Sequence, residues 1–230
     1  MRLEIKRHIP NFITLSNLLL GVLALIFASK GEFIWAGAFI FLATIPDFLD
    51  GLMARMLGVT SDIGKDLDSL ADMVSFGVAP AVLFYQLEIY YEFKWIAYVV
   101  LLIPLFAALR LAKFNNDDRQ SEEFFGLPTP SVALFIASWP FIIEYDLYHL
   151  EAYLTTAFTF VAVPVVLSVL MVSEIRLFSL KFKNLTLVDN RYRYLLLLCA
   201  FIMLIFLRFA AIPLIIILYI VLSIIRNFAR

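Results

Sequence analysis

The sequence is poor in cysteine and histidine. Its 230 residues include one cysteine, Cys199, and two histidines. A single cysteine excludes an intramolecular disulfide, and because Cys199 lies inside an apolar run we expect it to be a small core side chain. Any metal bound by a polar cluster of this chain would therefore have mainly oxygen ligands, which suit hard cations better than zinc.

Charged residues are scarce as well. They make up 16% of the chain, whereas hydrophobic residues make up 63%, and the mean hydropathy is +0.94. This composition excludes a soluble globular protein and indicates one membrane-embedded domain over residues 1–230. The net charge of −1 points to no particular partner. No repeat or second domain is evident, and we expect no nucleic-acid partner.

Long apolar runs predict an all-α, polytopic membrane protein with about eight transmembrane helices, because each run is close to the length that crosses ~30 Å of hydrocarbon. The runs cover residues 9–29, 32–55, 64–87, 92–113, 129–145, 150–172, 192–208 and 211–228. Basic and apolar residues alternate over residues 1–9, which predicts a short N-terminal interfacial helix. The first run is too long for a cleavable signal peptide.

The basic residues predict how the protein is oriented. If the N-terminus is cytoplasmic, the loops around 56–63, 114–128 and 173–191 are cytoplasmic too. All of the 18 Lys and Arg residues then lie near that face, except Lys30, Lys94 and Arg208. The positive-inside rule favours this arrangement. We expect an integral protein of a bacterial or archaeal cytoplasmic membrane.

Residues 46–80 carry four aspartates at regular spacing: Asp47, Asp50, Asp68 and Asp72. On helices, the first two share one face at i,i+3 and the last two share another at i,i+4. Four carboxylates that converge in or near a membrane repel one another unless cations neutralise them. We therefore predict a divalent metal site for Mg²⁺ or Mn²⁺, with Ca²⁺ also fitting, and two ions that serve phosphoryl chemistry.

Small and basic residues accompany the aspartates. Gly51 and Ala54 leave a groove beside the first pair, and Gly64 lies one helical turn before Asp68, so a nucleotide can approach the backbone there. Arg55 adds a donor suited to phosphate. Two further aspartates, Asp62 and Asp66, fall outside the pattern, and we expect them to be solvated.

A polar stripe marks the first apolar run. Asn11, Thr14 and Asn17 follow one another at i,i+3,i+6 along one face. The stripe either holds helices together by hydrogen bonds or borders the nucleotide groove. Both interpretations are open from the sequence.

The aspartate motif is Asp-x-x-Asp-Gly-x-x-Ala-Arg, eight residues, then Gly-x-x-x-Asp-x-x-x-Asp, and it resembles the signature of the CDP-alcohol phosphotransferase family at every fixed position. The resemblance implies an integral membrane enzyme of that family's fold, which uses a divalent metal to transfer a substituted phosphate from a CDP-linked donor to an alcohol and releases CMP. It also implies a homodimer.

Three flanking patches extend the resemblance. They are the run DMVSFGVAPA with Ser75, the run RLAKFN with Arg110, Lys113 and Asn115, and the run FFGLPTPSVA with Gly126. Each alone is also consistent with packing or capping. Together they resemble the branch of integral-membrane phosphatidylserine synthases over most of residues 8–135, which implies CDP-diacylglycerol and L-serine as substrates. Glycerol 3-phosphate and inositol phosphate are the alternative acceptors.

The resemblance also assigns roles to residues. Asp72 matches the family's general base, although metal coordination would weaken a carboxylate as a base unless one oxygen stays free. Serine carries a carboxylate, so Arg110 and Lys113 are the best candidates to bind it, although basic loop residues also bind anionic membrane lipids. The alternatives from other functional classes are a cation transporter and a scaffolding protein. Neither function explains why Gly51, Ala54 and Arg55 occupy fixed positions of the motif.

Overall fold

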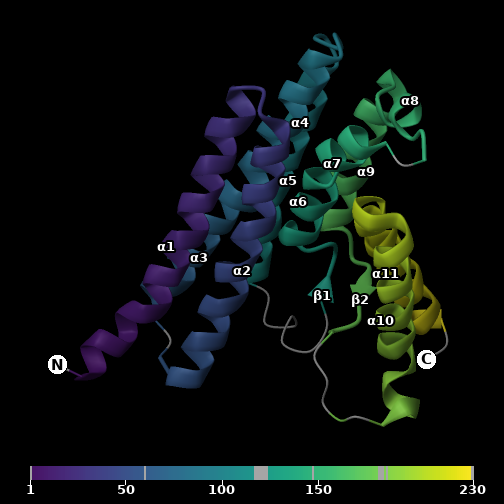
Figure 1. The fold of residues 1–230 in the computed structure, drawn as a ribbon. Coiled ribbons are helices and arrows are strands. Elements are labelled where there is room, and N and C mark those ends of the chain that lie inside the picture. Colours follow the sequence, from purple (N-terminus) through teal and green to yellow (C-terminus); the bar gives the residue numbers. More distant parts are fainter. Residues whose placement is uncertain are drawn as a thin grey trace.

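The computed structural model describes residues 2–59, 61–116, 124–146, 148–180, 184 and 186–228, with side chains from residue 8 onward except that of Phe124. The chain is helical almost throughout (Figure 1). The helices are α1 (Arg2–Ser29), α2 (Phe33–Leu57), α3 (Asp62–Asp72), η1 (Met73–Val78), α4 (Ala79–Tyr90), η2 (Ala97–Leu101), α5 (Leu102–Asn116), α6 (Thr129–Ala137), α7 (Trp139–Tyr145), α8 (Glu151–Leu154), α9 (Ala157–Val172), α10 (Leu187–Leu207), η4 (Arg208–Ala210) and α11 (Ala211–Phe228). Two short strands, β1 (Phe124–Phe125) and β2 (Arg176–Leu177), pair antiparallel.

Five helical segments among the described residues are long and apolar enough to cross a membrane. They are His8–Ser29, Phe33–Leu57, Asp62–Tyr90, Ala97–Asn116 and Leu187–Phe228. These segments are consistent with the integral membrane protein that the composition predicts, and the helical fold class is confirmed.

The count of eight spans is not confirmed and stays a prediction. The segment 187–228 contains two packed helices, α10 and α11, because the backbone turns at Arg208, where φ is +49°. The run 129–145 is divided at Ser138 into α6 and α7, and the apolar helix Ala157–Val172 is shorter than a full span. The N-terminal interfacial helix also stays a prediction: α1 begins at Arg2 and runs on unbroken, and the side chains of residues 2–7 lie outside the described part.

A tight connection links α2 to α3 and fixes the spacing of the aspartate motif. Gly58 ends α2 with φ +62°, a left-handed conformation that glycine adopts without strain. Ser61 then begins α3, because its side-chain oxygen accepts a hydrogen bond from the backbone N–H of Gly64 at 3.0 Å. The two halves of the motif therefore lie on two helices joined by a few residues.

The helix α1 packs along α2 and also contacts α3, η1 and α4. Figure 1 shows α1 and α2 as a long pair at one side of the molecule and α10 and α11 at the other. Small side chains such as Ala24, Ala28 and Ala36 allow the close approach of α1 and α2. A second hydrophobic core includes residues of α4, α7 and α9, where the ring of Phe84 makes edge-to-face contacts with Trp139 and Phe160.

Candidate active site

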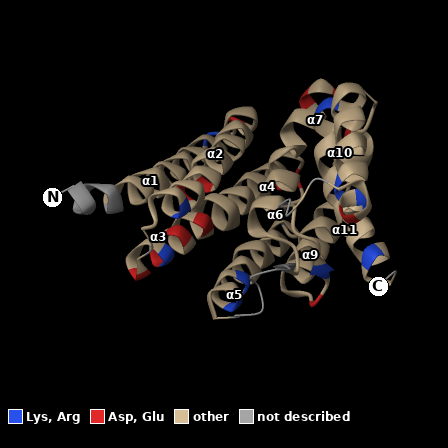
Figure 2. Ribbon diagram, turned by 90° about the horizontal axis from the view of Figure 1, so that it is seen from below, with Lys and Arg blue, Asp and Glu red and all other residues tan. Residues whose placement is uncertain are grey.

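The structure brings three aspartates of the motif together. Carboxylate oxygens of Asp47, Asp50 and Asp68 all lie within 4.8 Å of one another. Asp47 and Asp50 come from the second half of α2, and Asp68 comes from α3, so the site bridges the two helices. Figure 2 shows the acidic residues of α2 and α3 near one another. Asp50 is only 6% exposed, and carboxylates this close repel one another without a cation.

Buried oxygens at the site lack hydrogen-bond partners among the described residues. These are Oδ2 of Asp50, Oδ1 of Asp68 and Oδ1 of Asn17. Buried polar atoms in proteins are almost always paired, so acceptors without donors indicate that a cation belongs there. Carboxylate and amide oxygens are the ligands of hard divalent cations. The residues present therefore fit the divalent metal that the motif implies.

The fourth aspartate is held by α1. Asp72 is buried and lies against Asp47, and its Oδ1 accepts a hydrogen bond from Nδ2 of Asn17 at 3.2 Å. The π-helix η1 begins at the next residue. Segments of π-helix occur frequently at functional sites, and the sequence pattern did not reveal this one.

A cavity of about 470 Å³ opens beside the aspartates. Its lining comes from α1, α2, α3 and the connection between α2 and α3, and consists of Pro10, Asn11, Thr14, Asp50, Gly51, Ala54, Val59, Ser61, Asp62, Gly64, Lys65 and Asp68. Among the residues that the structure describes, a methyl group built on Gly51 would meet the guanidinium of Arg55 alone, at 3.6 Å. The space beside Gly51 is therefore open, as the groove interpretation requires.

The polar stripe of α1 faces this site. Thr14 is buried, donates to the backbone oxygen of Pro10 at 3.0 Å and lies beside Asp50. Asn11 lines the cavity, and its Oδ1 would lie 3.3 Å from a methyl group on Gly64. Asn11 and Thr14 thus border the cavity, and Asn17 joins α1 to α3. Both interpretations of the stripe stay predictions.

Lys65 is a cavity residue that the sequence analysis did not single out. It is exposed, lines the cavity and donates from Nζ to the backbone oxygen of Asn115 at 2.8 Å. The sequence could have indicated this role of Lys65, because Lys65 lies three residues before Asp68 and residues at this spacing are neighbours on a helix surface. Asp62, expected to be solvated, is exposed and lines the same cavity.

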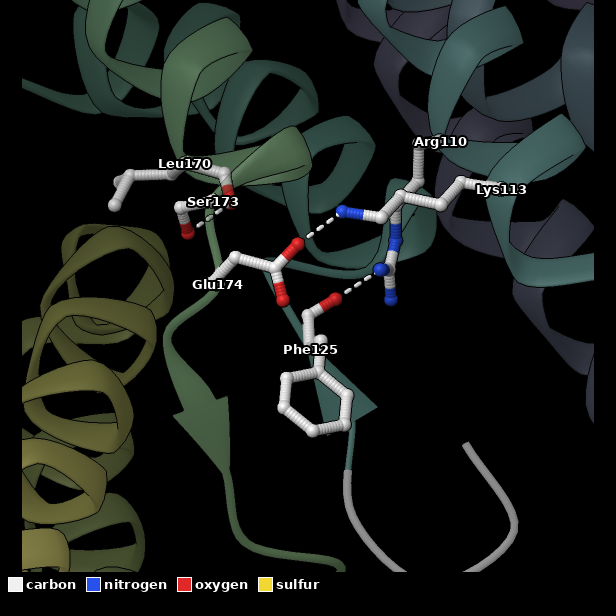
Figure 3. A network of polar contacts seen from close by, with 6 residues as sticks. All are labelled: Arg110, Lys113, Phe125, Leu170, Ser173 and Glu174. Atoms are coloured by element: carbon white, nitrogen blue, oxygen red, sulfur yellow. Dashed lines mark hydrogen bonds and ion pairs between the residues drawn. The ribbon is translucent and has the colours of Figure 1, made fainter. Parts of the chain in front are cut away.

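Arg110 and Lys113 are residues of α5 that contact β1 and the residues just after α9 (Figure 3). Arg110 is 4% exposed, and its Nη1 donates to the backbone oxygen of Phe125. Lys113 forms an ion pair with Glu174. Within the described part of the chain, neither cation lines the cavity.

The other residues considered for serine binding also lie outside the cavity lining. The hydroxyl of Ser75 is buried and donates to the backbone oxygen of Asn17 at 3.0 Å. Asn115 donates from Nδ2 to the hydroxyl of Ser69 at 2.7 Å. Gly126 has φ +73°, and a methyl group there would lie 2.4 Å from the carbonyl oxygen of Met171, so this position requires glycine.

Comparison with known proteins agrees with this geometry. A family model described as CDP-alcohol phosphatidyltransferase matches residues 7–170, which is more than half of the chain. The chain belongs to the CDP-alcohol phosphatidyltransferase family. The match includes the whole aspartate site and ends before α10 and α11.

Three relatives match between 54% and 86% of this chain. A CDP-diacylglycerol–serine O-phosphatidyltransferase of Helicobacter pylori is 34% identical over 202 residues, which are 86% of this chain and 81% of the relative. An archaetidylserine synthase of Methanothermobacter thermautotrophicus is 36% identical over 170 residues, 73% of this chain and 68% of the relative. A protein of Bacillus subtilis with the same name as the first is 39% identical over 124 residues, 54% of this chain and 70% of the relative.

Proposed function

We propose that this member of the CDP-alcohol phosphatidyltransferase family transfers the phosphatidyl group of CDP-diacylglycerol to L-serine and releases phosphatidylserine and CMP. The observation that carries the proposal is the group of buried carboxylate oxygens, without hydrogen-bond donors among the described residues, beside an open cavity. The names of the relatives, two of them CDP-diacylglycerol–serine O-phosphatidyltransferases, support the choice of donor and acceptor.

Asp47, Asp50, Asp68 and Asp72 are the residues that would hold the metal, with Mg²⁺ or Mn²⁺ as the first choice, Ca²⁺ as the second, and two ions in all. When bound, such ions offset the negative charge of the diphosphate and stabilise the CMP leaving group. The three aspartates whose oxygens cluster within 4.8 Å support this assignment.

The nucleotide of the donor would occupy the cavity. Gly51, Ala54 and Gly64 let it approach the backbone of α2 and α3. Asn11 and Thr14 offer polar groups from α1, Asn17 binds the neighbouring Asp72, and the exposed Arg55 serves the phosphates from the end of α2. The acyl chains remain in the surrounding lipid.

The transfer itself needs one base. Asp72 takes the proton of the serine hydroxyl, the serine oxygen forms a bond to the phosphorus that carries the diacylglycerol, and the bond from that phosphorus to the oxygen of CMP breaks. Asn17 holds Oδ1 of Asp72 in place, so that the carboxylate is oriented to accept the proton.

The carboxylate of serine requires a cationic partner. Arg110 and Lys113 are our candidates, with Ser75 and Gly126 as flanking residues. The carbonyl of Phe125 occupies one of the five N–H donors of Arg110, and the remaining donors suit a planar carboxylate. For Lys113 the ion pair with Glu174 must open before serine can bind.

The arrangement in the membrane follows from the same proposal. The single domain of residues 1–230 has about eight spans, lies in a cytoplasmic membrane and forms a homodimer, as the family resemblance implies. The active site faces the cytoplasm, where CMP is released, because the basic residues cluster on that side.

One experiment tests the activity. The purified protein in lipid nanodiscs receives CDP-diacylglycerol, Mn²⁺ and labelled L-serine, glycerol 3-phosphate or inositol phosphate in parallel reactions. We expect labelled phosphatidylserine and an equal amount of CMP with serine, and neither product with Asp72→Asn. A faster release of CMP with glycerol 3-phosphate would overturn the choice of serine.

A further inference from the structure

The aspartate helix α3 is tied to the end of α5 by reciprocal hydrogen bonds. Nδ2 of Asn115 donates to the hydroxyl of Ser69 at 2.7 Å. Nζ of Lys65 donates to the backbone oxygen of the same Asn115 at 2.8 Å. Ser69 in turn donates to the backbone oxygen of Lys65 at 3.1 Å. One residue of α5 therefore holds two positions of α3 that lie one helical turn apart.

These contacts lie next to the metal site. Asp68 directly precedes Ser69, and its Oδ1 is one of the buried oxygens without a hydrogen-bond partner among the described residues. Because successive residues are about 100° apart around a helix axis, a contact at Ser69 sets the direction in which Asp68 points. The face held by Asn115 thus determines how the neighbouring face meets Asp47 and Asp50.

On its other side, α3 packs against α1. The close fit at Gly64, where a methyl group would lie 3.0 Å from Oγ of Ser61 and 3.3 Å from Oδ1 of Asn11, holds the first turn of the helix. The bonds to Asn115 oppose this contact from the side of α5. Functional groups must be held within roughly 0.5 Å and 10–20° of the working geometry, so a helix fixed on one side alone is poorly suited to carry a metal ligand.

We propose that Asn115 is a positioning residue, which fixes α3 through Ser69 and Lys65 so that Asp68 completes the metal site with Asp47 and Asp50. This role deepens the proposed function and rests on the part of it that assigns the aspartates to a metal. It also replaces a direct contact of the Asn115 side chain with serine, because that side chain is already bonded to α3.

The test measures binding of Mn²⁺ alone to the full-length protein in nanodiscs, by titration calorimetry or by the electron paramagnetic resonance of free Mn²⁺. We expect Asn115→Ala to weaken Mn²⁺ affinity roughly 3- to 10-fold, the effect of one lost hydrogen bond. The KM for serine should stay at the wild-type value. Asn116→Ala is the matched control, since Asn116 bonds only within α5 in the described structure, to the backbone oxygen of Ala112, and its Mn²⁺ affinity should not change.

Ser69→Ala removes the acceptor of the same bond without altering α5. It should reproduce the loss of Mn²⁺ affinity, and the double variant should be no weaker than either single variant, because the two residues act through one contact. Unchanged Mn²⁺ affinity in both single variants, or a raised KM for serine with unchanged Mn²⁺ affinity, overturns the proposal. If the wild type binds Mn²⁺ but prefers another acceptor, only the choice of serine fails.

Discussion

The side chain of Asn17 in α1 donates a hydrogen bond to Oδ1 of Asp72 in α3 across 3.2 Å. Both residues are buried, so the bond is shielded from water. We expect Asn17→Leu to reduce kcat/KM for serine by roughly 10- to 150-fold, because a hydrogen bond to a charged group contributes roughly 1.5–3 kcal/mol. The measurement is release of CMP at saturating donor.

Ser16→Ala is the control for this substitution. Ser16 is the preceding residue of α1 and donates to the backbone oxygen of Phe12, so its loss should leave turnover unchanged. If Asn17→Leu also abolished Mn²⁺ binding, Asn17 would be a metal ligand through its amide oxygen rather than a residue that orients Asp72.

Removal of one metal ligand should abolish transfer. Asp68→Asn is expected to lower Mn²⁺ affinity by more than the roughly 10- to 100-fold that the loss of an outer contact costs at a metal site, and Asp47→Ala and Asp50→Ala should behave alike. The measurement is Mn²⁺ titration together with CMP release. Asp66→Asn is the control, because Asp66 is exposed and outside the cluster. Normal turnover of any ligand variant would remove that residue from the mechanism.

Two glycines of helices α1 and α2 should respond in opposite ways to a side chain. A methyl group on Gly51 would make an ordinary contact with the guanidinium of Arg55 at 3.6 Å, so Gly51→Ala should keep Tm and raise the KM for CDP-diacylglycerol. Gly51→Leu should block donor binding. A methyl group on Gly21 would lie 2.3 Å from Oγ of Ser75, so Gly21→Ala should cost about 1–3 kcal/mol of stability. Thermal unfolding and donor kinetics separate the two effects. An unchanged donor KM in Gly51→Leu would refute the assignment of the groove.

The proximity of Asp47, Asp50 and Asp68 could be predicted from the sequence because it depends largely on short-range spacing. The i,i+3 and i,i+4 intervals of the aspartates fix the directions of their side chains once the helices form. The three polar residues of α1 likewise indicated polar contacts in an otherwise apolar helix. The partners of Arg110 and Lys113 could not be predicted, because Phe125 and Glu174 lie 15 and 61 residues away in the chain. The sequence shows that these residues are cations but not what they bind.

Helix boundaries were predicted less well, also for a physical reason. The run 129–145 is largely apolar, yet the hydroxyl of Ser138 bonds back to the oxygen of Phe135 at 2.6 Å and Pro140 follows two residues later. The helix is therefore divided within a stretch that hydropathy alone reads as one span. The π-helix after Asp72 escaped prediction in the same way, because hydropathy does not distinguish it from an α-helix.

Glu88 in α4 offers a way to stabilise the protein. It is fully buried, and neither of its carboxylate oxygens has a hydrogen-bond partner among the described residues. Because burial of an unpaired polar group costs about 1–3 kcal/mol, Glu88→Met should raise Tm, and turnover should not change since Glu88 is not part of the cavity lining. Glu151→Met is the contrast: Glu151 accepts a hydrogen bond from the hydroxyl of Tyr91 at 2.8 Å, so its replacement should bring no gain. A lower Tm for Glu88→Met would contradict this expectation.

Arg110 is the residue at which binding of serine and support of the fold can be separated. Arg110→Ala removes both the bond to the carbonyl of Phe125 and the proposed contact with the carboxylate of serine. We expect Arg110→Lys to restore the Tm lost in Arg110→Ala, because an ammonium group can still donate to a carbonyl. The kcat/KM for serine should stay roughly 10- to 150-fold below wild type, because a point charge does not reproduce the two parallel bonds of a guanidinium. The measurements are serine kinetics at saturating CDP-diacylglycerol, donor binding and thermal unfolding of both variants. If Arg110→Lys recovers serine kinetics together with Tm, Arg110 only holds β1 against α5; if donor affinity falls instead, the guanidinium binds a phosphate.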